Sequence, residues 1–386
     1  MLNILAISNY RSLRDIVVPL KKLNLITGAN GTGKSSMYRA LKLLADTAQG
    51  RVVPSLAREG GLTSTVWAGP ESIAASVRRG EHAVEGTVRK QRVNLRLGFA
   101  GSEYGYLIDL GLPSDRGSAF SLDPQIKQEF VWHGPVLRPA AVLADRKVSL
   151  VRSRGSNDWQ VITDRLSPAE SMMSLVVDPR QSPELLFLRE SIRAWRFYDH
   201  FRTDAEAPAR SPQLGTYTPI LVNDGADLAA AIQTIREIGD AEALRVAVED
   251  AFPKSQLDIE VNTGRFTLLM RQQGLLRSLS MAEVSDGTLR FLLWIAALLS
   301  PRPPELMVLN EPETSLHPDL LPALARLIVR CSGRCQMVIV SHAKPLIDAL
   351  HAQPECHAIV LEKDFGETKV SGANRLNTPT WHWPQR

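Results

Sequence analysis

The chain has 386 residues, of which 44% are hydrophobic and 22% charged, and its formal net charge is +4. These values are ordinary for a globular protein with a large core, and three cysteines argue against a disulfide framework. The longest apolar stretch, residues 291–299, is about half a membrane span, and no signal-peptide pattern opens the sequence. We therefore expect a cytoplasmic protein that does not contact membranes.

The first half of the chain is predicted to begin with strands and one helix and to continue into an antiparallel region. Strands are expected over residues 2–7, 15–19 and 23–27, and a helix over 36–44. Residues 64–163 repeatedly alternate apolar and polar side chains, with examples at 93–97, 104–110 and 148–151. Period-two patterns separated by Gly, Pro and Asp predict an antiparallel β subdomain.

The second half is predicted to be helical first and then to alternate helices with strands. Helices are expected over 226–238, 241–252, 289–299 and 320–330, and strands over 257–261, 266–270, 306–309 and 337–340. The alternation after residue 283 predicts a mainly parallel sheet covered by helices, hence an α/β fold. We divide the chain into an N-terminal part of the sheet domain (1–60), the β subdomain (61–165), a helical lobe (166–254) and a C-terminal part of the sheet domain (255–386).

A phosphate-binding loop lies between the predicted strand 23–27 and the helix after it. Its sequence fits G-x-x-x-x-G-K-[ST], the Walker A motif, in the strand–loop–helix setting that the motif requires. The backbone N–H groups of such a loop and the helix N-terminus bind phosphate. Lys34 would neutralise the phosphates and the Ser35 hydroxyl would ligate Mg²⁺. We predict nucleotide contacts from Gly28, Ala29, Asn30, Gly31, Thr32, Gly33, Lys34, Ser35 and Ser36.

Three further motifs follow in the last third of the chain. An apolar strand ends in Asn310-Glu311, where a Walker B motif would lie, and a second strand ends in His342. Upstream, Ser285-Asp286-Gly287 opens a predicted helix. With the phosphate loop, these motifs resemble the ABC ATPase superfamily, more narrowly its soluble SMC/RecF-like and OLD-like branch. The resemblance covers residues 1–50 and 275–350, and it implies a P-loop ATPase head.

The resemblance also implies roles for individual residues. Ser285, Asp286 and Gly287 would contact the γ-phosphate held by a second protomer, which implies a homodimer with ATP between its heads. Glu311 would be the general base, His342 would sense the γ-phosphate, and residues 315–318 would link the two sites. Gln213 is a weaker candidate for contacting Mg²⁺. Structural alternatives remain open, because Ser285 could simply cap its helix and His342 could be a histidine buried at a strand end.

One position departs from the family pattern, since the usual aspartate before the base is Asn310. An amide keeps the hydrogen-bonding shape but loses the charge, and hydrogen bonds to charged groups contribute ~1.5–3 kcal/mol. We therefore expect slow hydrolysis, with Glu311 retained as the base. The sequence leaves open whether the amide is natural to the subgroup or was introduced to trap the nucleotide.

Two functions remain open for this ATPase. One is action on DNA in repair or genome maintenance, in a RecF-like manner. Its candidate surfaces are Arg89, Lys90, Gln91, Arg92 and Arg96, and a second stretch with Arg189, Arg193, Trp195, Arg196, Tyr198 and Arg202, where cations and aromatic rings could bind the backbone and stack on bases. In the alternative, each stretch is a solvated charged face with its aromatic side chains packed underneath. The other is a nucleotide-state switch that controls a partner protein in defence or signalling. We expect no nuclease within the chain, because no clustered carboxylates follow His342.

Overall fold

A computed structural model describes residues 1–386 except 72–93, 114–116, 156–157, 176–178 and 375–376. The chain forms two compact units, each built from separate segments. The first contains residues 1–21, 28–195 and 359–386, and the second contains residues 22–27 and 196–358. In the described part of the chain, no helix has the length and apolar character needed to cross a membrane.

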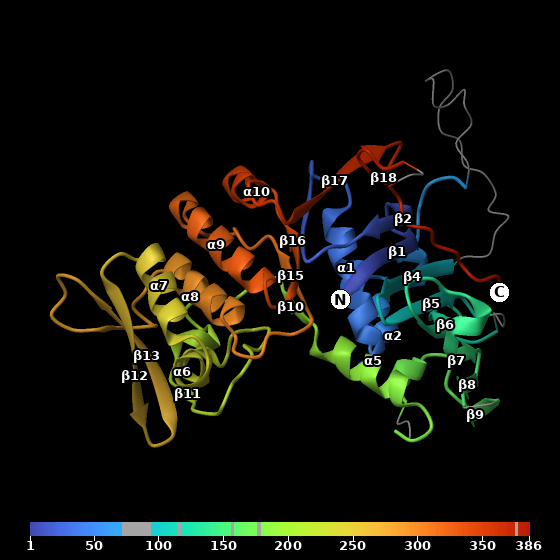
Figure 1. The fold of residues 1–386 in the computed structure, drawn as a ribbon, viewed down its shortest axis with the longest axis horizontal. Coiled ribbons are helices and arrows are strands. Elements are labelled where there is room, and N and C mark those ends of the chain that lie inside the picture. The colour runs from blue at the N-terminus through green and yellow to red at the C-terminus, as the bar shows by residue number, and fades with distance from the viewer. Residues whose placement is uncertain (72–93, 114–116, 156–157, 176–178, 375–376) are drawn as a thin grey trace. The chain divides into compact units, whose positions relative to one another are not determined.

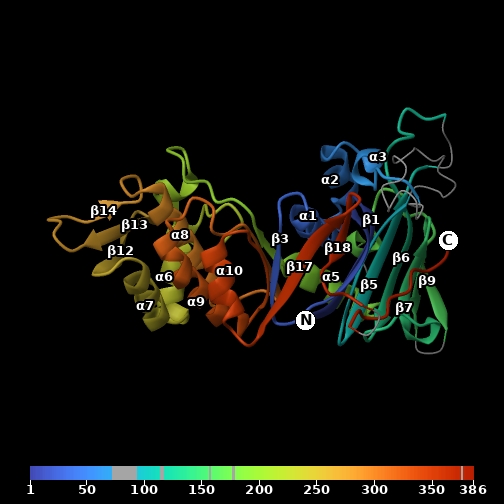
Figure 2. The same ribbon diagram turned by 90° about the horizontal axis from the view of Figure 1, so that it is seen from above.

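The first unit is built on an eight-stranded antiparallel sheet in the order β2-β1-β4-β5-β6-β7-β8-β9 (Figure 2). Its strands are β1 (Leu2–Tyr10), β2 (Leu13–Pro19), β4 (Asn94–Gly101), β5 (Tyr104–Gly111), β6 (Gln125–His133), β7 (Val142–Lys147), β8 (Leu150–Arg154) and β9 (Trp159–Thr163). The predicted period-two region thus continues the sheet begun at the N-terminus, because β4 pairs with β1. The alternating run 148–151 begins in the turn between β7 and β8, where Val148 has φ 56°, and its last two residues begin β8.

Short helices and a C-terminal hairpin complete the first unit. The helices are α1 (Lys34–Thr47), α2 (Val52–Arg58), α3 (Leu62–Thr65) and α5 (Pro183–Ala194). The hairpin joins β17 (Cys356–Asp364) to β18 (Glu367–Val370), and the Thr368 N–H donates to the Ser12 carbonyl at the β1–β2 turn. This hydrogen bond places β18 beside the start of the sheet, next to the phosphate loop.

The second unit contains the parallel part of a six-stranded sheet, whose order is β10-β15-β16-β3-β17-β18. The strands of the parallel part are β10 (Arg196–Tyr198), β15 (Leu306–Asn310), β16 (Gln336–Val340) and β3 (Leu23–Gly28), whose last residue belongs to the first unit. Side chains of β15 and β16 are almost all buried, as expected for parallel strands covered on both faces. The predicted mainly parallel sheet is therefore present.

The α-helices of this unit are α6 (Leu228–Ile238), α7 (Ala241–Ala251), α8 (Asp286–Leu298), α9 (Leu321–Ser332) and α10 (Lys344–His351) (Figure 1). Helix α9 packs on β16, and α6 and α7 pack on α8. Every residue of α8 from Leu289 to Leu298 is buried. Its Trp294 ring packs on Phe201 with 4.8 Å between centroids, and Phe291 packs on Phe252 at 5.7 Å. A small antiparallel sheet of β11 (Gln213–Leu214), β12 (Ser255–Asn262), β13 (Arg265–Gln272) and β14 (Leu279–Ser280) completes the unit.

A buried ion pair holds the first unit's sheet to the loop after it, and its removal is expected to be costly. Arg146 Nη1 lies 2.9 Å from Glu129 Oε2, and both side chains are fully buried. Glu129 also accepts hydrogen bonds from Tyr106 Oη at 2.6 Å and the Met172 N–H at 2.8 Å. Removing one partner of such a pair typically costs ~3–5 kcal/mol.

We therefore expect Glu129→Ala to lower the free energy of unfolding in urea by about 3 kcal/mol or more. Arg245→Ala is the control, because it breaks an exposed ion pair with Glu242 and is expected to leave the unfolding midpoint unchanged. Equal midpoints for wild type and Glu129→Ala would show that the buried pair does not stabilise the unit.

Candidate functional site

The phosphate loop joins β3 to α1 and takes a backbone shape that only glycine adopts easily. Gly28, Gly31 and Gly33 have φ values of 147°, 78° and 104°. A Cβ at Gly33 would overlap Thr368 Oγ1, and one at Gly28 would overlap the Leu361 carbonyl oxygen. The motif glycines are therefore required both by the backbone conformation and by the β17–β18 hairpin packed against the loop.

The Lys34 side chain contacts the backbone of the phosphate loop. Its Nζ donates to the carbonyl oxygens of Gly28 at 2.7 Å and Ala29 at 3.0 Å, and its side chain is buried. The next residue, Ser35, is exposed at the first turn of α1, a helix with no side-chain cap and no acidic residue in that turn. The N–H groups of this turn and the Ser35 hydroxyl are thus available to an anion and its metal.

The parallel register of the second unit brings the other motifs to one edge of the sheet. Val340 of β16 is aligned with Asn310 of β15 on one side and with Ile26 of β3 on the other. Glu311 and Ser341-His342 therefore follow their strands at the edge where β3 ends. The phosphate loop begins two residues after Ile26, so it starts from this same edge.

Glu311 occupies a strained position immediately after β15. Its φ is 49°, a value that costs a non-glycine residue about 1–3 kcal/mol, and its N–H donates to the Val340 carbonyl at 2.8 Å. The side chain is 37% exposed, and Oε1 lies 3.7 Å from His342 Nδ1. The carboxylate is therefore accessible and lies beside the histidine that follows the neighbouring strand.

Glu313 is a buried carboxylate that organises the end of β16. Its Oε1 accepts from Ser341 Oγ at 2.7 Å, the His342 N–H at 2.9 Å and the Ala343 N–H at 3.1 Å. His342 Nδ1 lies 3.5 Å from the same oxygen. The histidine is half-exposed and held by Glu313, so it is not an ordinary histidine buried at a strand end.

Asn310 directs its amide nitrogen to a carboxylate of the neighbouring strand. Nδ2 donates to Asp199 Oδ1 at 2.7 Å, and Asp199 directly follows β10, which pairs with β15. Asn310 Oδ1 is buried and has no hydrogen-bond partner among the described residues. Asp199 could have been suspected from the sequence, because it ends a short strand-like run, Arg196-Phe197-Tyr198.

Ser285 caps α8, and an arginine from a distant loop supports the turn around it. The Ser285 hydroxyl accepts from the Thr288 N–H at 3.2 Å. Arg210 donates to the Met281 and Val284 carbonyls at 2.7 and 2.9 Å and pairs with Asp286 at 2.5 Å. Neither spacing nor composition signalled Arg210, since its partners around the start of α8 lie 71 to 76 residues away in sequence.

A second buried arginine connects α8 to the segment after Glu311. Arg290 donates from Nη1 to the Thr314 carbonyl at 3.0 Å and from Nη2 to the Phe201 carbonyl at 3.1 Å. Burial lowers the pKa of this guanidinium. A Cβ at Gly287 would lie 3.4 Å from the Ser315 carbonyl, so the start of α8 also approaches the segment 315–318. The turn Ser285-Asp286-Gly287 and the segment 315–318 thus form one packed region.

Gln213 uses its side chain within the second unit. Its Oε1 accepts from the Ala229 N–H at 2.8 Å, and its Nε2 donates to the Pro208 carbonyl at 3.4 Å. These bonds tie β11 to the start of α6. Both ends of the amide are therefore occupied by protein groups.

The basic stretches predicted for DNA have other contacts where the structure describes them. Trp195 and Tyr198 are buried, in agreement with the alternative of rings packed beneath a charged face, so neither is exposed for stacking on bases; Trp195 packs on Phe99 and Tyr198 on Trp294. Arg189 and Arg193 lie close to Glu190, Arg202 pairs with Asp204, and Arg96 lies 3.3 Å from Asp109. Residues 89–92 fall outside the described part of the chain.

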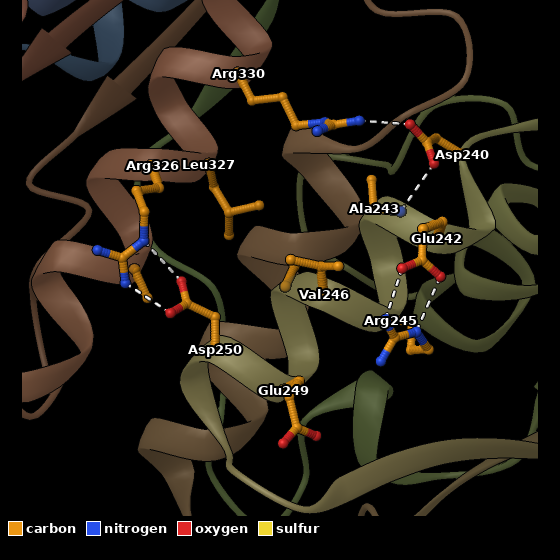
Figure 3. A pocket seen from close by; sticks show the side chains of 12 residues that line it. Asp240, Glu242, Ala243, Arg245, Val246, Glu249, Asp250, Arg326, Leu327 and Arg330 are labelled. Carbon is orange, nitrogen blue, oxygen red and sulfur yellow. Dashed lines mark hydrogen bonds and ion pairs between the residues drawn. The ribbon is translucent and has the colours of Figure 1, made fainter.

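The second unit also has a pocket between α7 and α9 (Figure 3). Its volume is about 610 Å³, and ion pairs of Arg326 with Asp250 and Arg330 with Asp240 cross its walls. None of the predicted nucleotide or metal residues lines it. The pocket is therefore separate from the candidate nucleotide site.

The sequence from residue 23 to residue 349 matches the family described as an AAA domain, putative AbiEii toxin, type IV TA system. The chain belongs to this family. No curated protein matches its sequence.

Solved structures of Smc heads share the fold. One is an Smc head bound to the C-terminal winged-helix domain of ScpA, with 13% identity, 96% of this chain and 97% of that chain covered, and a TM-score of 0.51. Another, from Pyrococcus furiosus, is an Smc head with an extended coiled coil bound to the C-terminal domain of ScpA, with 11% identity, 96% and 95% coverage and a TM-score of 0.51. The chain thus has the P-loop fold of an Smc head, which confirms the predicted fold class, and its family match is to an AAA domain.

The donors present fit magnesium, which binds oxygen ligands and usually combines one or two protein oxygens with phosphates and water. Ser35 Oγ is exposed at the start of α1, and Asn310 Oδ1 is free of protein partners among the described residues. Elsewhere in the described residues, no cluster of three or more His, Cys, Asp and Glu side chains is arranged around a metal position.

The neighbouring glutamates 311 and 313 should respond differently to the same substitution. Glu311→Gln removes a half-exposed carboxylate that accepts no backbone hydrogen bond from the residues that the structure describes, so we expect nucleotide binding and thermal stability to persist. We expect hydrolysis to fall at least ~100-fold, the scale of general-base catalysis. The measurements are phosphate release, fluorescent ATP binding and thermal unfolding.

Glu313→Gln places an amide N–H₂ in a buried carboxylate position and weakens three hydrogen bonds to residues 341–343. We expect a loss of about 1–3 kcal/mol in the free energy of unfolding, together with slower hydrolysis. Unchanged stability in Glu313→Gln, or a stability loss in Glu311→Gln equal to that of Glu313→Gln, would contradict the assigned difference between the two carboxylates.

Proposed function

We propose that this ATPase binds Mg²⁺·ATP at the phosphate loop and hydrolyses it slowly, and that its nucleotide state controls a partner protein. The supporting observation is the parallel register that starts the phosphate loop from the sheet edge carrying Glu311 and His342. Phosphoryl transfer depends mainly on positioning and charge stabilisation, which such an edge can supply. Mg²⁺ would neutralise charge on the phosphates.

The roles follow from the position of each group. Lys34 would exchange its two loop carbonyls for phosphate oxygens, and Ser35 would contribute one oxygen to the metal. Glu311 would accept a proton from the attacking water, and His342, held by Glu313, would donate a hydrogen bond to the γ-phosphate. Gln213 enters this proposal only if its contacts with Pro208 and Ala229 break.

ATP would also join two copies of the chain. Ser285, Asp286 and Gly287 lie in an exposed turn at the N-terminus of α8, where backbone N–H groups and the helix dipole favour an anion. The turn is supported by Arg210 and lies next to the segment 315–318. We propose that this surface contacts the γ-phosphate bound by a second protomer.

Control of a partner protein is favoured over direct action on DNA. The described arginines of both candidate DNA surfaces already have acidic neighbours or internal contacts, and the aromatic rings among them are buried. The family description also names a putative toxin of a type IV TA system, which agrees with the defence setting of this candidate function. RecF-like action on DNA in repair remains the second candidate function.

Dimerisation is tested by light scattering with Mg²⁺·ATP and Glu311→Gln, which slows turnover. We expect the mass of the Glu311→Gln protein to double with ATP. The double variant Ser285→Arg/Glu311→Gln should keep the mass of a monomer, because the long side chain occupies the anion position. Ser118→Arg, at an exposed serine of the first unit, is the charge control and should dimerise. Normal dimerisation of the Ser285→Arg protein would show that the turn Ser285-Asp286-Gly287 does not lie in the dimer interface.

The partner is tested by ATP turnover with and without single- and double-stranded DNA at low and moderate salt, with Lys34→Ala as the blank. We expect turnover that DNA does not change. Salt-sensitive stimulation by DNA, as counterion release requires, would instead establish the RecF-like candidate.

A further inference from the structure

Asp199 and Asn310 form a pair at the end of two adjacent parallel strands. Tyr198 of β10 is aligned with Leu309 of β15, so the next residue of each strand, Asp199 and Asn310, emerges at the same level. Asn310 Nδ2 donates to Asp199 Oδ1 at 2.7 Å. The carboxylate is thus one hydrogen bond away from the position where the family pattern carries an aspartate.

The hydrogen bond determines how the amide is oriented. A carboxylate can only accept hydrogen bonds, so the amide must present its N–H₂ to Asp199. Asn310 Oδ1 therefore faces the other way, where it is buried and has no partner in the described part of the chain. Buried polar atoms are rarely left without a partner, which indicates that this oxygen has one when the site is loaded.

We propose that Asp199 supplies the negative charge that Asn310 lacks, and that the pair acts as a composite acidic group toward the magnesium of Mg²⁺·ATP. This inference rests on the proposed function and adds a residue to it. Asn310 Oδ1 accepts a hydrogen bond from a metal-bound water, while Asp199 fixes the amide and polarises it through a charge-assisted bond. Asp199 is therefore a positioning residue whose charge acts through Asn310.

A purely structural role explains the pair less well. Asp199 is exposed, and a surface hydrogen bond of this kind contributes little to stability. It holds no backbone group or helix end in any contact described for it. Its one described side-chain contact is with the residue that precedes the proposed base.

The test is the magnesium dependence of nucleotide binding. Binding is measured from the fluorescence of a methylanthraniloyl-ATP probe while Mg²⁺ is titrated. Asp199→Asn keeps a hydrogen-bond acceptor for Asn310 but removes the charge. We expect its Mg²⁺ midpoint to rise about tenfold, with probe binding in EDTA unchanged. Asp250→Asn, which removes a carboxylate of α7 paired with Arg326, is the control and should match wild type.

The exchange of the two residues gives a second comparison. The double variant Asp199→Asn/Asn310→Asp carries the same atoms with the charge on the other strand, and we expect its Mg²⁺ midpoint to return to within about threefold of wild type. Mn²⁺ bound to the protein–nucleotide complex, counted by electron paramagnetic resonance, should follow the same order. Thermal unfolding without nucleotide should not distinguish the variants.

The outcomes separate this inference from the proposed function. If wild-type protein does not bind the probe with Mg²⁺, the proposed function itself is wrong. If wild type binds and Asp199→Asn has the same Mg²⁺ midpoint, Asp199 has no such role and the proposed function stands. A double variant no better than Asp199→Asn would also overturn the inference, because charge on either strand should serve.

Discussion

The parallel pairing of β10, β15, β16 and β3 is the constraint on which the rest of the site depends. Parallel strands deliver their carboxyl ends to one edge, so residues distant in sequence emerge together without any direct attraction between them. Asp199, Glu311 and Ser341 reach this edge because each directly follows a strand, and Asn310 because it is the last residue of one. A shift of register by one residue would turn each of these side chains to the opposite face.

Hydrogen bonds from polar side chains then fix the conformations of the loops, which the pairing register of the strands does not determine. Glu313 accepts from three donors at the end of β16, and Arg290 and Arg210 hold backbone oxygens around α8. Each is a charged group in a place where an unpaired charge would be expensive. Such networks favour one arrangement of the loops over others, while the strained backbone of Glu311 keeps one carboxylate accessible.

The sequence was sufficient for those features that a local pattern encodes. The phosphate loop, the strands ending at Asn310 and Val340 and the helix beginning at Ser285 each carry their signal within a few residues. The roles of Asp199, Arg210 and Glu313 could not be read in this way, because their partners lie 111, about 75 and about 29 residues away. Aromatic residues beside arginines, such as Trp195 and Tyr198, give the same sequence pattern whether they are buried or exposed. Only the tertiary packing distinguishes a surface that could stack on bases from a packed core.

The burial of α8 has a mechanical consequence for the turn that precedes it. A helix that is buried on every side has no face that can be exposed to water without loss, because exposing its apolar surface would cost roughly 25 cal/mol for each Å². Ser285 therefore cannot slide or rotate with its helix alone. A displacement of the turn at Ser285 would therefore also displace α6, α7 and α9, which pack on α8.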